Sequence, residues 1–136
     1  MRNLVRSACA AALVLAAASA WAAPTPMGAI LKVTVDGLKP DGGPVQVGIY
    51  DEATFPVLPD TPLFKRQVDA EAAVVIDFAR LPPGAYAIKA FQDLNGNGKR
   101  DAGEPSAISN GAADSDFDAA AIALMPGANM AALHLR

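Results

Sequence analysis

The sequence predicts an all-β protein, a single Greek-key sandwich of about seven short strands. Apolar and polar residues alternate along several short stretches, which is the pattern of strands with one buried face. Glycine and proline, with 11 residues each, separate these stretches as turn residues do. The sequence shows no internal repeat, and only one short stretch has a composition suited to a helix. We therefore expect the strands to pack around one core.

Residues 1–23 are predicted to be a cleaved signal peptide. Two arginines precede an apolar run from Ala8 to Ala18, which is too short to span a bilayer as a stable helix. The sequence Ala20-Trp21-Ala22 then provides a small-x-small cleavage site. We expect cleavage after Ala22 or Ala23.

The remaining segment, residues 24–136, is predicted to be one acidic domain that is periplasmic or secreted and has no membrane span. The leader carries two of the 11 basic residues and none of the 14 acidic ones, so the domain has a net charge of −5. Such a domain lacks the basic surface that nucleic-acid binding needs. Its expected partner is an unknown protein or envelope component. The domain also holds no cysteine, which excludes disulfides and cysteine-based metal sites.

Two alternating stretches open the domain and are predicted to pair as a hairpin. Residues 30–35 and residues 45–50 each place every second residue on an apolar face. The inward residues are Leu31, Val33 and Val35 in the first stretch, and Val45, Val47 and Ile49 in the second. A dense cluster of turn residues, 39–44, separates the two.

Residues 51–69 are predicted to be a long connection, because three prolines exclude a helix or a central strand. The prolines are Pro56, Pro59 and Pro62. We expect the connection to carry four apolar residues over an edge of the core: Phe55, Leu58, Leu63 and Phe64. Alternatively, the connection lines a binding surface.

Two further strands are predicted on either side of a tight corner. Residues 72–79 place Val74, Ile76 and Phe78 inward. The pair Pro83-Gly84 then suits a type II turn. Tyr86 follows at the position of the tyrosine corner of Greek-key sandwiches, in which the hydroxyl bonds to upstream backbone.

The C-terminal region is predicted to end in a hairpin. Residues 106–111 suit a loop or a short strand. Residues 117–124 suit a strand or a helix, because they are rich in alanine and follow potential N-capping residues. The strand is preferred, since Met125-Pro126-Gly127 would then turn the chain into a last strand over 130–135, with Leu133 and Leu135 inward.

The most specific motif is the stretch from Asp93 to Glu104. It fits the calcium-loop template D-x-[DN]-x-[DN]-G-x₅-E at every constrained position, with Gly98 at the sharp turn. The predicted ligands are the side chains of Asp93, Asn95, Asn97, Asp101 and Glu104 and the backbone carbonyl of Lys99. The alternative is a polar turn without metal, because Asn-Gly occurs twice.

This loop is expected to bind Ca²⁺ weakly. It leaves a strand, so the two flanking helices of an EF-hand are absent. Three carboxylates bring charge to the ion, whereas Lys99 and Arg100 oppose it. The predicted dissociation constant is on the order of 10⁻⁴ M, as in extracellular modules.

Taken together, these motifs resemble the bacterial family called domain of unknown function 2141. The resemblance is carried by Gly37-Leu38-Lys39, Val45–Tyr50, Leu81–Ala87, Phe91–Gly98, Ser109-Asn110-Gly111-Ala112 and Phe117-Asp118-Ala119. It implies an exported, single-domain β-sandwich of immunoglobulin-like or transthyretin-like type, with no established function. The segment Glu104–Ser109 is shorter than its counterpart in many members. The loop is also similar to that of the B-type repeats of serine-aspartate surface adhesins, which calcium stiffens.

The predicted function is a non-enzymatic module, stabilised by calcium, with a structural or interaction role in the cell envelope. Alternatively, the protein binds a small or glycan ligand through residues 51–69, with Tyr50, Phe55 or Phe64 exposed. No catalytic residue is predicted, because His134 is the only histidine and falls on the polar side of the last strand. The sequence also holds no Gly-x-Ser-x-Gly nucleophile motif.

Overall fold

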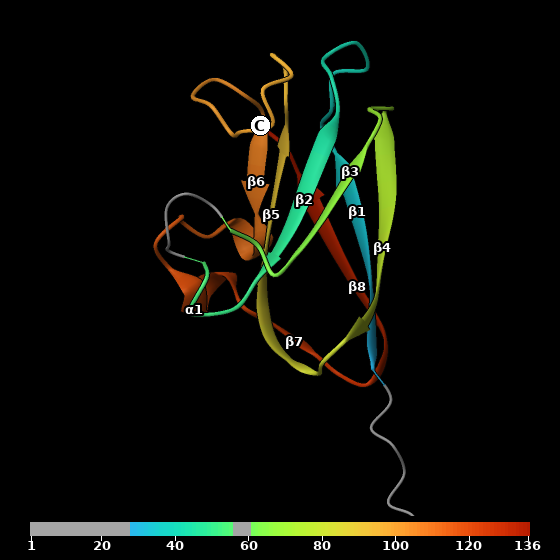
Figure 1. Cartoon of the computed structure of the whole chain (residues 1–136), viewed down its shortest axis with the longest axis vertical. Helices are drawn as coiled ribbons and strands as arrows, with labels where there is room; N and C mark the ends of the chain where they lie inside the picture. Colours follow the sequence, from blue (N-terminus) through green and yellow to red (C-terminus); the bar gives the residue numbers. More distant parts are fainter. Residues whose placement is uncertain (1–27, 56–60) are drawn as a thin grey trace, which may run out of the picture.

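The structure is a computed structural model that describes residues 28–55 and 61–136 (Figure 1). The predicted signal peptide and Leu58 lie outside the described residues. The described part is all-β, as predicted, with eight strands rather than seven. The strands are β1 (Ala29–Asp36), β2 (Val45–Tyr50), β3 (Phe64–Val68), β4 (Ala73–Leu81), β5 (Gly84–Gln92), β6 (Ser106–Ile108), β7 (Ile122–Leu124) and β8 (Gly127–His134). A 3₁₀ turn, η1 (Ser109–Gly111), and one helical turn, α1 (Phe117–Ala120), complete the elements.

The strands form two sheets, in the orders β4-β1-β8 and β3-β2-β5-β6. Strand β7 pairs with the beginning of β5, below the end of the second sheet (Figure 1). The pair β1–β8 is parallel, and the other pairs are antiparallel. The apolar faces of both sheets meet in one core, to which the alternating residues of β1, β2 and β4 contribute as predicted.

The predicted hairpin between the first two strands is wrong. Strand β1 pairs with β4 and β8, whereas β2 pairs with β3 and β5, so the two strands belong to different sheets. The buried side chain of Gln92 holds the loop that makes this crossing, because it bonds to the backbone of that loop. Lys39 N–H donates to Gln92 Oε1 at 2.8 Å, and Gln92 Nε2 donates to the carbonyls of Lys39 and Gly43. Backbone groups that a hairpin would pair are thus satisfied by a side chain.

The chain passes from the first sheet to the second at the corner between β4 and β5. Tyr86 Oη donates a hydrogen bond to the carbonyl of Pro82 at 2.6 Å, as predicted for a tyrosine corner. Burial, followed by the charge of Asp51, raises the pKa of the Tyr86 hydroxyl. The predicted type II turn is wrong, since Gly84 has φ 156° and lies at the extended start of β5.

The prediction of an irregular connection over residues 51–69 is wrong in its last part. Residues 64–68 form β3, which pairs with β2 at the edge of the second sheet. The strand begins after Pro62, the last of the three prolines, so its backbone N–H groups can join the ladder. Phe55 is buried, as expected for a residue that covers the core, whereas Leu63 is exposed.

The C-terminal region differs from the preferred prediction in two ways. Residues 117–120 form a helical turn capped by Asp116, whose Oδ1 accepts the N–H of Ala119, and only residues 122–124 form a strand. The predicted terminal hairpin is also wrong, because β7 pairs with β5 and β8 pairs with β1. The short strand over 106–108 and the buried Leu133 and Leu135 agree with the predictions.

Candidate functional site

The predicted metal loop begins where β5 ends and lies beside the loop that joins β1 to β2 (Figure 1). Its first residue, Asp93, is only 2% exposed. Asp93 N–H donates to the carbonyl of Pro44 at 2.9 Å. Gly43 must be a glycine, because a Cβ there would lie 2.2 Å from the carbonyl oxygen of Asp93. The start of the loop is therefore held against the neighbouring loop by close backbone contact.

The carboxylate of Asp93 organises the first half of the loop. Its Oδ1 accepts the N–H of Gly96 at 2.9 Å, and its Oδ2 accepts the N–H of Gly98 at 2.7 Å. Gly98 has φ 77°, which confirms the sharp turn predicted at this position. A buried carboxylate is compensated here by two backbone donors.

Three of the predicted ligands converge in the middle of the loop. The amide nitrogens of Asn95 and Asn97 both donate to Oδ2 of Asp101, at 2.7 Å and 2.5 Å. These hydrogen bonds, together with the charge of Lys99, hold the pKa of Asp101 below its usual value. Rotation of each amide by half a turn would replace its nitrogen with its oxygen. The same three side chains would then form a cluster of oxygens.

Glu104 closes the loop with both of its oxygens. Oε1 accepts the N–H of Leu94, and Oε2 accepts the N–H of Asp101, both at 2.9 Å. The twelfth residue of the motif therefore joins the beginning of the loop to its last turn. The template assigns both oxygens of this glutamate to the ion, whereas here both accept backbone N–H groups.

The loop has the donor chemistry of a hard cation, because all six predicted ligands offer oxygen. The structure brings Asn95, Asn97 and Asp101 together, while Asp93 and Glu104 face backbone N–H groups of the same loop. Within the described residues, no three Asp, Glu, His or Cys side chains are grouped closely enough to hold a metal. Binding of Ca²⁺ would therefore exchange internal hydrogen bonds for coordination. The set fits the ion in its chemistry and requires local rearrangement.

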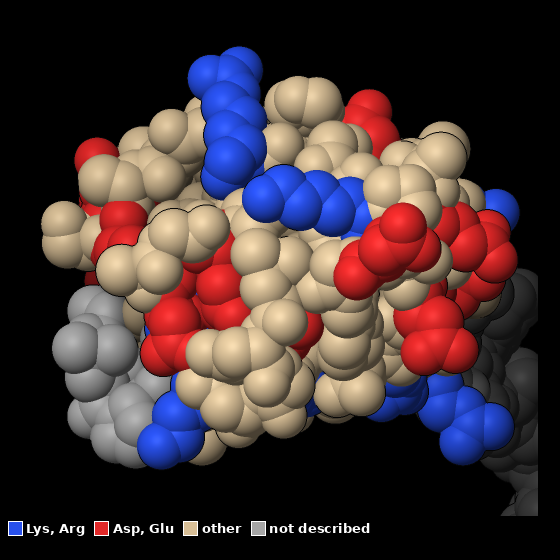
Figure 2. All heavy atoms as spheres, turned by 90° about the horizontal axis from the view of Figure 1, so that it is seen from above, with Lys and Arg blue, Asp and Glu red and all other residues tan. Residues whose placement is uncertain are grey.

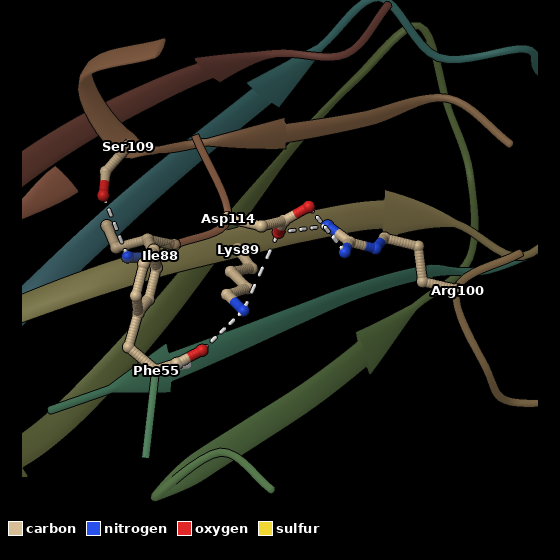
Figure 3. A network of polar contacts seen from close by, with 6 residues as sticks. All are labelled: Phe55, Ile88, Lys89, Arg100, Ser109 and Asp114. Carbon is tan, nitrogen blue, oxygen red and sulfur yellow. Dashed lines mark hydrogen bonds and ion pairs between the residues drawn. The ribbon is translucent and has the colours of Figure 1, made fainter. Parts of the chain in front are cut away.

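A polar network that was not predicted lies next to this loop, on the outer face of the second sheet (Figure 3). Lys89 is only 6% exposed; its Nζ donates to the carbonyl of Phe55 at 2.8 Å and lies 3.8 Å from Oδ1 of Asp114. It also lies 4.8 Å and 4.4 Å from the ring centroids of Tyr50 and Phe55. A lysine within an otherwise apolar strand was the signal in the sequence that could have revealed this network.

Arg100 connects the loop to the same network. Its two terminal nitrogens donate to the two oxygens of Asp114, each at 2.9 Å (Figure 3). The hydrogen bond from Arg100 is the main reason that the pKa of Asp114 is lowered. The structure places Asp114 between these two cations.

The aromatic residues of the alternative ligand site are not at the surface. Tyr50 and Phe55 belong to a small second core that also contains Ala87 and Ala120. The rings of Tyr50 and Phe55 meet edge to face, with centroids 6.3 Å apart. Phe64 is half-buried against the main core. These rings therefore pack against other side chains and are not presented at the surface for a ligand.

Comparison with protein families decides the affiliation of the chain. A model of the bacterial family described as "Uncharacterized protein conserved in bacteria (DUF2141)" matches residues 33–131. The chain belongs to this family. Comparisons with curated proteins and with solved structures give no match. Among the described residues, no helix combines the length and the apolar character needed to cross a bilayer.

Two of the segments that resemble DUF2141 proteins contact each other in this member of the family. Ser109 Oγ accepts the N–H of Ile88 at 3.0 Å (Figure 3), and it donates to the carbonyl of Ala120 at 2.5 Å. Asn110 Nδ2 donates to the carbonyls of Ala119 and Ala121. The 3₁₀ turn and α1 are thereby tied to β5, and they cover the second core.

The single histidine also has a partner. His134 Nδ1 lies 2.6 Å from Oδ1 of Asp36, the residue opposite it in the parallel pair of β1 and β8. Both side chains are more than half exposed. The pair is a surface contact between the two strands, and the histidine lies on the exposed side of the last strand, as predicted.

Proposed function

We propose that this protein is an exported, non-enzymatic module that calcium stabilises through residues 93–104, with a structural or interaction role in the cell envelope. The main support for this proposal is that every predicted ligand belongs to one loop. The polar side chains of that loop already form hydrogen bonds with other groups of the same loop. The loop is anchored at its start by Asp93 N–H and is closed by Glu104. A cation would exchange these hydrogen bonds for coordination in a loop that is already held at both ends, which reduces the entropy that binding must overcome.

The expected affinity is low, and the effect on stability is nonetheless measurable. The charges of Lys99 and Arg100 lie within the loop and oppose the ion. With a dissociation constant on the order of 10⁻⁴ M, millimolar calcium adds about 1–2 kcal/mol to the free energy of unfolding. That free energy corresponds to a rise of several degrees in melting temperature for a domain of this size.

Thermal melts of residues 24–136 with calcium and with chelator test the proposal. The wild-type melting temperature should rise in calcium, and Glu104→Gln should abolish the rise. The matched control, Glu71→Gln, removes an exposed carboxylate outside the loop and should keep it. Equal midpoints of the wild type in calcium and in chelator would contradict the structural role of the ion.

We also propose that the two sheets form a Greek-key sandwich of transthyretin-like type. After β3 and β4, strand β5 returns to pair with β2, which is the return of a Greek key. An immunoglobulin constant-type sandwich pairs its first two strands in one sheet, whereas β1 and β2 lie in different sheets. A crystal structure that placed β1 beside β2 would contradict this assignment.

A further inference from the structure

The outer face of the second sheet holds a cleft between β2, β3, β5 and the loop of residues 93–104. Its volume is about 370 Å³, which suits a small organic molecule. We call it the basic cleft, because its lining includes Lys65, Lys89, Lys99 and Arg100. None of the described lining residues is an aspartate or glutamate, although the whole chain is acidic.

The register of the sheet places two of these cations beside one glycine. Gly48 of β2 is opposite Lys65 of β3 on one side and Lys89 of β5 on the other. Residues opposite one another on neighbouring strands point to the same face of the sheet. A Cβ at Gly48 would lie 2.9 Å from Cε2 of Tyr50, so the glycine allows that ring to fold over the strand between the two lysines.

Gln46 supplies an unpartnered polar group in the same cleft. It lies two residues before Gly48, lines the cleft and is only 2% exposed. Its Oε1 has no hydrogen-bond partner among the described residues. A buried acceptor without a partner costs about 1–3 kcal/mol, so a water or a ligand hydroxyl that donates to it would stabilise this position.

The loop contributes the remaining cations. Lys99 is exposed, and Arg100 is oriented by its bidentate contact with Asp114. Asp114 faces Arg100 and Lys89, whereas no ion pair of Lys65 or Lys99 is found within the described residues, so these two lysines supply positive charge to the cleft. At the end of the molecule that carries the loop, acidic and basic side chains otherwise lie side by side (Figure 2). A cleft lined by one sign of charge is therefore a local feature that attracts a ligand of the opposite sign.

We propose that the basic cleft binds a small organic anion, a carboxylate or phosphate that also carries a hydroxyl group. The acid group lies among Lys65, Lys99 and Arg100, and the hydroxyl donates to Oε1 of Gln46, whose buried side chain turns toward the cleft. The carbon skeleton packs on Pro62 and Phe91, which line the same space. This binding role goes beyond the calcium-dependent stability, because Gln46, Gly48 and Lys65 belong to strands, and only Lys99 and Arg100 belong to the loop that would hold the ion.

The test uses nuclear magnetic resonance titrations of residues 24–136 with two anions and their neutral counterparts. Glucuronate is compared with glucose, and glycerol 3-phosphate with glycerol. The two comparisons measure recognition of a carboxylate and recognition of a phosphate separately. The titrations are made in metal-depleted Tris chloride buffer, and those with the carboxylate pair are repeated in calcium. At least one anion should bind about tenfold more tightly than its neutral counterpart. The shifted amides should be those of residues 46–48, 65, 89 and 98–100.

Two variants and a matched control make the result specific. Lys65→Glu should weaken anion binding about tenfold or more, whereas Lys32→Glu, the same charge change on the outer face of the other sheet, should not. Gln46→Leu should preserve or raise the melting temperature, because it removes the unpartnered Oε1, and should weaken binding of the hydroxylated anion. The proposal is overturned if neither anion binds in any of the buffers used. It is also overturned if Lys65→Glu and Lys32→Glu weaken anion binding equally. The same holds if both Lys65→Glu and Gln46→Leu bind the anions as well as the wild type does.

Discussion

The carboxylate of Asp114 shows how one side chain links the loop to the sheet. It accepts two hydrogen bonds from Arg100 and lies close to the buried Nζ of Lys89. Its pKa is lowered in the folded protein, so its contribution to stability is present above the pKa of the unfolded chain, which is about 3.9. That contribution is lost as the pH falls through the lower, folded value.

Replacement of this residue is therefore expected to have a pH-dependent effect. Asp114→Asn should destabilise the protein at pH 7 by about 1 kcal/mol or less, since the side chain is 56% exposed and solvent screens the pair. The difference from the wild type should shrink at acid pH, below the folded pKa. Urea unfolding at several pH values measures it, with Asp118→Asn as the control. A difference that stays constant with pH would contradict the ion-pair role.

The hydroxyl of Tyr86 gives a second prediction at this scale. Tyr86→Phe keeps the ring in the core and removes the bond to the Pro82 carbonyl, so the free energy of unfolding should fall by about 1 kcal/mol. The midpoint of urea unfolding should decrease while the slope is unchanged. An unchanged midpoint would show that the hydroxyl contributes nothing to the corner.

At the scale of the elements, Ser109 joins three segments through one hydroxyl. Ser109→Ala would leave the N–H of Ile88 and the carbonyl of Ala120 without their buried partner. We expect a loss of about 1–3 kcal/mol, the cost of unsatisfied buried groups. Ser106→Ala, in the neighbouring strand β6, is the matched control and should cost less. Equal midpoints of urea unfolding for the two variants would contradict this role.

The elements also show what the sequence could and could not predict. The period-two pattern located β1, β2 and β4, because burial on one face is a local property. It could not predict which strands pair, since β1 and β2 present equally apolar faces and the side chain that holds the loop between them comes from the distant Gln92. In the loop, the motif predicted the ligand types but not their orientation. The directions of Asp93 and Glu104 are set by backbone N–H groups that no motif specifies.

At the scale of the whole molecule, one core joins the two sheets. Val33 of β1 and Val47 of β2 are both fully buried in it, although they lie on opposite sheets. Each sheet covers the apolar face of the other, so neither is expected to persist alone. The structure therefore predicts a single cooperative unfolding transition.

Native-state hydrogen exchange tests this expectation with one substitution in each sheet. Val33→Ala and Val47→Ala should each lower the free energy of unfolding by about 1–3 kcal/mol, because each removes two buried methyl groups. The decrease should appear equally in the slowest amides of both sheets, since both exchange through the same global opening. If Val33→Ala accelerated exchange only in β1, β4 and β8, the sheets would be separate units. The shared core would then not be what holds this fold together.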